Sequence, residues 1–137
     1  MLLTTAQQFA LARFLANWTG TPSSQVVFEG EGHEAVDDSE SPWVRVSVNE
    51  TSGGQQTLGP VGGRKYRRRA RVDVQVFTPV DKGTRPGFLL AEQARTIFEG
   101  QYFDDLYFFD CEISNTGKDE KWQQTLATVR FDFWETK

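Results

Sequence analysis

The chain has 137 residues, the size of one domain, and 13% of them are aromatic. This is enough to build a hydrophobic core without disulfide bonds or structural metal ions. Fifteen basic residues against nineteen acidic ones give a net charge of −4, so any contact with nucleic acid would have to come from a local patch. One cysteine and one histidine exclude an internal disulfide and a multi-cysteine zinc site. The sequence shows no signal-peptide pattern and no apolar stretch long enough to span a membrane, so we expect a single domain over residues 1–137 without membrane contact.

The first half of the chain predicts one helix followed by strands. A capping-box pattern at residues 4–8 opens an apolar repeat of helical spacing, which predicts a helix over residues 5–18. The sequence QVVFE at 25–29 is a short strand candidate, and WVRVSV at 43–48 alternates like a half-buried strand. Residues 49–63 are rich in Gly, Ser, Thr and Gln without a period, and they predict a long loop.

The second half continues with strands around a second helix. Residues 65–77 alternate over the longest strand candidate, and Thr84 with Pro86 suits the entry to a helix that ends at Gly100. Further strands are expected from residue 109 to a break at 114–120, and again over 122–134.

This order predicts an α+β fold, in which two helices pack on one face of a largely antiparallel, mixed sheet of about five strands. The predicted core consists of Leu11, Phe14, Leu15, Leu90, Ile97, Phe98, Val44, Val46, Val72, Val74, Val76, Val129 and Phe131.

The nominal chemical motifs all have plainer interpretations. The GxGxxA spacing at 30–35 is followed by acidic residues rather than by a helix, and carboxylates would repel a pyrophosphate. We interpret His33 as a solvated side chain. Cys111 lies within an alternating strand pattern, and we interpret it as a core residue. No serine is framed by a strand-turn-helix elbow. We therefore predict no catalytic, cofactor or metal site, and a protein that is not an enzyme.

A dense basic run is the most conspicuous charged feature. Six cations fall within eight residues: Arg64, Lys65, Arg67, Arg68, Arg69 and Arg71. Such a row protects an exposed strand or faces an anionic neighbour, either phosphates or an acidic surface of another subunit. We favour a subunit interface in which Arg64, Lys65, Arg67, Arg69 and Arg71 meet an acidic segment that contains Glu29, Glu31, Glu34, Asp37 and Asp38.

Several segments together resemble the tail terminator proteins of lambda-like, long flexible-tailed bacteriophages and related prophage domains. They are the helix that ends at Trp18, WVRVSV after an acidic stretch, Gly63-Arg64 before a strand that leads into VDVQVFTPVDKGTR, and LAEQARTIFEG. The likeness runs from about residue 5 to 134 and is sharpest over 72–100.

The resemblance implies a virion structural protein without catalytic residues. It would form a homo-hexameric ring that caps the tail tube, stops its polymerisation and joins the tail to the head connector. The implied partners are the tail tube protein and the head-tail connector protein, with DNA at most passing through the ring lumen. The protein would be located in the virion tail, and in the host cytoplasm during assembly.

The expected long loop suggests a contact with the tail tube. Its flexible glycines flank a small apolar tip, a composition typical of a segment that orders on binding. The predicted tube-contact residues are Gln55, Gln56, Thr57, Leu58, Pro60 and Val61. Two alternatives stay open from the sequence: a nucleic-acid-binding module that uses the basic run from Arg64 to Arg71, and another neck or head-completion protein.

Overall fold

The computed structural model describes residues 1–22, 25–28 and 41–137. Two helices and six strands make up these parts, together with a 3₁₀ turn at Val80–Lys82. In chain order the elements are α1 (Leu3–Asn17), β1 (Val26–Phe28), β2 (Trp43–Gln55), β3 (Lys65–Pro79), α2 (Arg85–Phe98), β4 (Tyr102–Phe103), β5 (Leu106–Lys118) and β6 (Trp122–Thr136).

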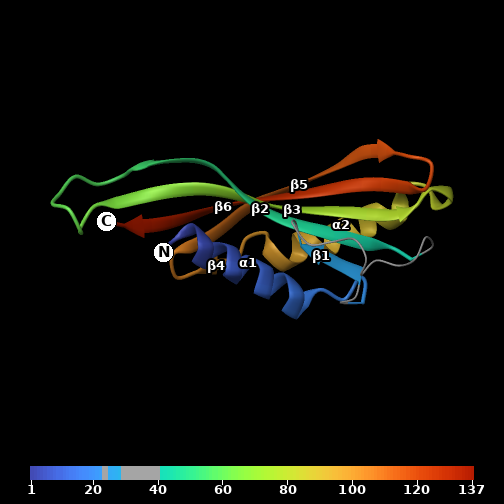
Figure 1. Cartoon of the computed structure of the whole chain (residues 1–137), viewed down its shortest axis with the longest axis horizontal. Helices are drawn as coiled ribbons and strands as arrows, with labels where there is room; N and C mark the ends of the chain where they lie inside the picture. Colours follow the sequence, from blue (N-terminus) through green and yellow to red (C-terminus); the bar gives the residue numbers. More distant parts are fainter. Residues whose placement is uncertain (23–24, 29–40) are drawn as a thin grey trace.

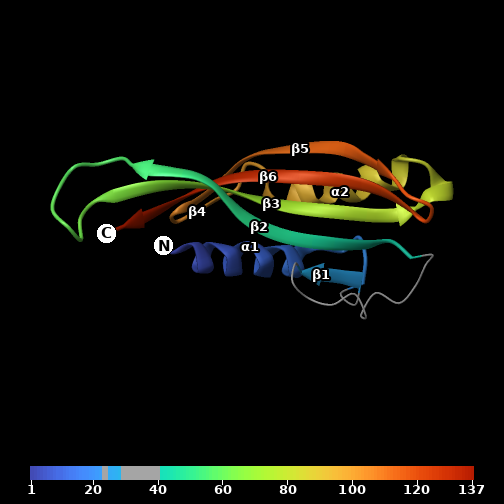
Figure 2. The ribbon, with the colours of Figure 1, turned by 45° about the horizontal axis from the view of Figure 1, so that its top comes forward.

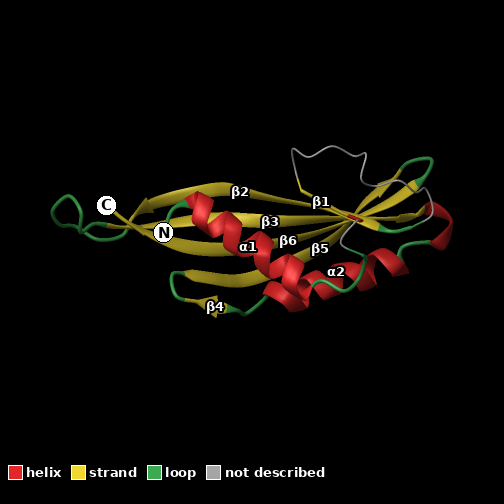
Figure 3. Cartoon of the chain, turned by 60° about the horizontal axis from the view of Figure 1, so that its bottom comes forward, coloured by secondary structure: helices red, strands yellow, loops and turns green. Residues whose placement is uncertain are grey.

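The strands form one mixed sheet in the order β1-β2-β3-β6-β5-β4. Only β1 and β2 run parallel, and the other neighbours are antiparallel. Both helices lie on the same face of this sheet (Figure 3). The α+β class is therefore confirmed, but the predicted strand number of about five is wrong.

The extra strand arises at the aromatic segment after α2. Tyr102 and Phe103 form the two-residue strand β4, which turns back through Asp104 and pairs with the start of β5. Asp104 has a φ of 39°, in the left-handed region that short turns use and that Asp tolerates better than most residues. A two-residue strand is too short to show a period in the sequence.

The core fills the layer between the helices and the sheet. On α1 the buried stripe is Ala6, Ala10 and Phe14, with Trp18 just beyond the helix end. Leu15 is 45% exposed, so its predicted place in the core is wrong. The small alanines let the helix backbone approach the sheet, and this turns Leu15 outward. The remaining predicted core residues are buried or pack partly buried against the core cluster.

The start of α1 also differs from the prediction. The helix begins at Leu3, with Leu2 as its N-cap and without a side-chain capping hydrogen bond. The capping box at residues 4–8 does not form because those residues already lie inside the helix.

The segment predicted as a loop over 49–63 is strand in its first part and a connection over residues 56–63. β2 continues to Gln55, with a register shift between Glu50 and Ser52, and pairs with β3 down to Tyr66. β6 pairs with β3 as far as Lys65, and β5 pairs with β6 only up to Phe133, so the sheet is three-stranded beyond Phe133. We call residues 49–71 and 130–136 the arm. It extends past the N-terminal end of α1, with the chain's C-terminus beside its tip (Figures 1 and 2).

Candidate functional site

The sequence singles out Cys111, His33 and the glycine motif at 30–35 as candidates for chemistry. Among the described residues, no group of three or more His, Cys, Asp or Glu side chains could hold a metal ion. Burial raises the pKa of the Cys111 thiol and so disfavours its thiolate, and this residue belongs to the core as predicted. His33 and the glycine motif at 30–35 lie outside the described residues. In the described part of the chain, no helix is long and apolar enough to cross a membrane.

The basic run lies on β3 in the arm, where it is divided between the two faces of the sheet. Ala70 and Val72 point into the core, so Arg67, Arg69 and Arg71 lie on the opposite, outer face. On the helix-side face Arg68 forms an ion pair with Glu135, at 3.1 Å from Nη2 to Oε1.

Two arginines of the outer face have carboxylate partners within the chain. Arg69 donates from Nε to Oδ1 of Asp132 at 2.8 Å and from Nη2 to Oδ2 at 3.3 Å, a two-pronged contact. Arg71 Nε lies 3.0 Å from Oδ2 of Asp73. These pairs offset much of the like-charge repulsion along the strand.

Asp132 is the central acidic group of the arm. It is almost fully buried and faces Arg69 directly across the β3–β6 pair. The hydrogen bond and the negative charge of Asp132 raise the pKa of Arg69, although burial acts in the opposite direction. Arg69 also lies over the ring of Phe109, 4.6 Å from its centroid, so its position is fixed from two sides.

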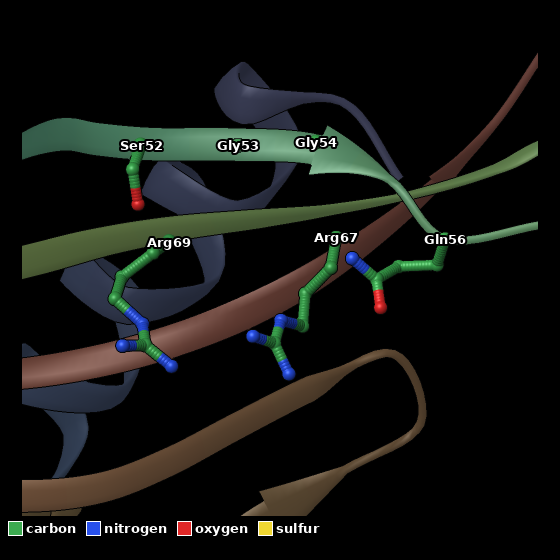
Figure 4. A pocket seen from close by; sticks show the side chains of 6 residues that line it. All are labelled: Ser52, Gly53, Gly54, Gln56, Arg67 and Arg69. Carbon is green, nitrogen blue, oxygen red and sulfur yellow. The ribbon is translucent and has the colours of Figure 1, made fainter.

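Arg67 is held much less firmly. Its Nε lies 3.7 Å from Oδ2 of Asp132, beyond hydrogen-bond distance, and its side chain is 46% exposed. Together with Arg69 it lines a shallow groove of about 240 Å³ whose other walls are Ser52, Gly53, Gly54 and Gln56. Figure 4 shows both arginine side chains pointing to the same side of β3, with Gln56 beside Arg67.

The tip of the arm is an ordered turn with two apolar side chains directed into solvent. Leu58 is 93% exposed and Val61 82%. Arg64 donates from Nε to the carbonyl of Gly59 at 2.9 Å, and the Lys65 backbone N–H donates to Oγ1 of Thr57 at the same distance. The tip therefore has internal bonds that hold the two apolar side chains apart from the core.

The predicted tube-contact residues do lie together at this tip. Gln55 is the last residue of β2, and the other five belong to the connection that follows it: Gln56, Thr57, Leu58, Pro60 and Val61. The predicted acidic side of the interface, Glu29, Glu31, Glu34, Asp37 and Asp38, lies outside the described residues. The pairing of basic run and acidic segment stays a prediction.

Reasoning from the sequence missed Asp132, Asp73 and Glu135 as partners of the arginines. Asp73 lies two residues from Arg71 on the same strand, a spacing visible in the sequence. The other two acids come from β6, and only the register of β3 with β6 places them opposite the basic run.

Comparisons with known proteins bear on the fold alone. No family model matches the chain, and no curated protein matches it. One similar solved structure shares 14% sequence identity, with a TM-score of 0.59, over 92% of this chain and 92% of that chain. This similarity shows that the arrangement of two helices and a mixed sheet occurs in another protein of the same length range.

Proposed function

We propose that the chain is a phage tail terminator, a virion protein that assembles into a hexameric ring, caps the tail tube and joins it to the head connector. The sequence resemblance suggests this function, and the arm is the observation that supports it best. A protein that stops a polymer needs a surface that reaches the polymer end, and the arm projects past the helical layer (Figure 2).

The distribution of charge suits a ring of identical subunits. The arm, residues 49–71 and 130–136, contains seven cations and three carboxylates, a charge of +4, so the other residues together carry −8 of the net −4. Subunits related by rotation about a ring axis contact each other through two different patches. An arm of one sign and a body of the other sign supply such a pair of patches and favour one orientation of contact.

The tip supplies a separate contact for the tube. Leu58 and Val61 are nearly fully exposed apolar side chains on a turn that internal hydrogen bonds already hold in place. An ordered turn loses less conformational freedom on binding than a free loop does. We therefore assign the tip to the end of the tail tube and the charged strands of the arm to the ring.

The test separates these two contacts. In the phage or prophage that encodes the chain, the double change Leu58→Ser and Val61→Ser should leave folding and ring formation intact but give tails of uncontrolled length. Leu89→Ser is the matched control, because Leu89 is an exposed leucine on α2, away from the tip. Tails of normal length with the double variant, measured by electron microscopy, would refute the tube contact.

A nucleic-acid-binding module is the rival function, and the ion pairs of Arg68, Arg69 and Arg71 within the chain leave it less basic surface than the sequence suggests. Salt-dependent retention of a short DNA duplex, lost when Arg67, Arg69 and Arg71 become Ala, would support that rival. Negative-stain microscopy of the purified chain tests the other side of this choice. Rings would favour the terminator, or another neck protein, over the nucleic-acid-binding module.

A further inference from the structure

The groove on the outer face of the arm holds several polar groups that have unused hydrogen-bonding capacity. The guanidinium of Arg67, the hydroxyl of Ser52 and the side-chain amide of Gln56 all line it, and none of them makes a hydrogen bond within the described residues. A Cβ added at Gly54 would meet no atom within 4 Å, so the floor of the groove is open to a ligand. The groove therefore offers three sets of donors around one accessible surface.

The charges of the groove call for one more anion. Two guanidinium groups share a single carboxylate, Asp132, and Arg69 takes both of its oxygens at hydrogen-bond distance. Arg67 approaches the same carboxylate only at 3.7 Å. One additional negative group in front of Arg67 would neutralise the second of the two guanidinium charges. Arginine and carboxylate groups would then alternate along this face.

The surroundings favour a carboxylate over a phosphate backbone. A polyanion is bound by a row of free cations, each neutralising one phosphate. On this face three other arginines have close acids, since Arg69 pairs with Asp132, Arg71 with Asp73, and Arg130 with Asp110 and Glu112, so Arg67 and Lys65 do not form part of a long row of free cations. A single planar guanidinium with unused donors matches a single carboxylate, to which it can bind in a fork.

We infer that this groove, formed by Ser52, Gly53, Gly54, Gln56, Arg67 and Arg69, binds an Asp or Glu side chain of a second copy of this chain. The charge of −8 outside the arm makes a neighbouring copy a rich source of carboxylates. The choice of a second copy rests on the ring proposed above, whereas the chemistry of the groove does not. Arg67 is then the anchor of the contact, and Gln56 and Ser52 supply further hydrogen bonds.

The first experiment tests the chemistry with probes that do not require a ring. Hexaglutamate should produce saturable NMR shifts at the amides of Gly53 and Gly54 and at Nε–H of Arg67, and hexaglutamine should not. Arg67→Gln should weaken binding at least about tenfold, because a charge-assisted hydrogen bond is lost. Arg85→Gln, which removes an exposed cation at the start of α2, should leave binding unchanged.

Three results would overturn the carboxylate site. They are an absence of saturable shifts, equal binding by the Arg67→Gln chain, or inorganic phosphate that shifts the same atoms as strongly as hexaglutamate at equal concentration.

The second experiment identifies the source of the carboxylate. Sedimentation velocity should show that the wild type and Arg85→Gln associate, that Arg67→Gln does so at least about tenfold more weakly, and that hexaglutamate competes with association. Equal association of the wild type and Arg67→Gln would overturn the second copy as occupant and leave the ring proposal standing. A wild type that stays monomeric would overturn both.

Discussion

Replacing Gly87 by Ala tests how closely α2 is packed on the sheet. Gly87 lies in the first turn of α2 and is buried. A Cβ built on it would overlap Oγ1 of Thr125 on β6 and lie 3.2 Å from the Cβ of Thr125 and 3.6 Å from Oγ1 of Thr78. Both threonines are fully buried, so neither can swing into solvent to make room.

Two opposing effects set the size of the change. Alanine is favoured over glycine in a helix by at most about 1 kcal/mol. Forcing an extra methyl group into a packed core costs about 1–3 kcal/mol, and here the displaced atoms belong to a central strand. We therefore expect Gly87→Ala to lower the free energy of unfolding by about 1–2 kcal/mol, although helix propensity alone predicts an increase.

A second substitution should recover most of this loss. The hydroxyl of Thr125 has no hydrogen-bond partner among the described residues, so Thr125→Ala removes the clashing atom without leaving a broken bond. In a double-mutant cycle followed by urea unfolding, we expect a coupling of about 1–2 kcal/mol that stabilises the double variant relative to the sum of the single ones. Gly54→Ala is the matched control, because its Cβ would meet open space. Additive effects, or a Gly87→Ala chain as stable as the wild type, would refute the close packing of α2.

Two further predictions concern the helical layer and the β5–β6 turn. Phe14→Ala should cost about 3–5 kcal/mol, because Phe14 is fully buried against Trp18 and the core, whereas Leu15→Ala should be nearly neutral; equal losses in thermal unfolding would contradict the packing of α1. Asp119 accepts backbone hydrogen bonds from Trp122 at 2.7 Å and from Lys121 at 2.8 Å, and these bonds hold its pKa below the ordinary value. A lowered pKa gives stability that is present above the unfolded-state pKa and is lost as the pH falls through the folded-state pKa. The free energy of unfolding of the wild type should therefore exceed that of Asp119→Asn at pH 7, and this difference should shrink below about pH 4. A difference that stays constant from pH 7 to pH 2 would exclude the carboxylate as its source.

The sequence predicts the buried parts of the sheet well, because residues that alternate between core and solvent leave a visible period. The valines at 44, 46, 72, 74 and 76 all point into the core as expected. The error at α1 has a physical origin in side-chain size. Hydrophobicity assigns Leu15 to the core, but Ala6 and Ala10 permit close approach of the helix, and an alanine stripe is a weak signal in a search for large apolar residues.

Residues 49–55 of the predicted loop over 49–63 are strand for a related reason. Residues 49–55 of β2 are almost all exposed, so this part of the strand has no buried face and its sequence needs no alternation. Gly53 has its own steric role, since a Cβ at this position would lie 2.8 Å from Cδ and 2.9 Å from Nη1 of Arg68. Hydrogen bonds to β3 hold the segment extended, and this pairing is not encoded within residues 49–63 themselves.

The same dependence on register decides the meaning of the basic run. In the sequence the run is a block of six cations, whose main consequence would be repulsion. In the sheet, β6 brings Asp132 opposite Arg69, and Arg71 forms an ion pair with Asp73 on its own strand. These ion pairs help to hold the strands of the arm in place. Arg64, Lys65 and Arg67 have no hydrogen-bonded acid within the described residues, and of these Arg67, whose Nε lies 3.7 Å from Asp132, borders the groove. An arm with incompletely neutralised cations on its outer face and an apolar tip at its end offers two different contacts, one for each of the proposed partners, the ring and the tube.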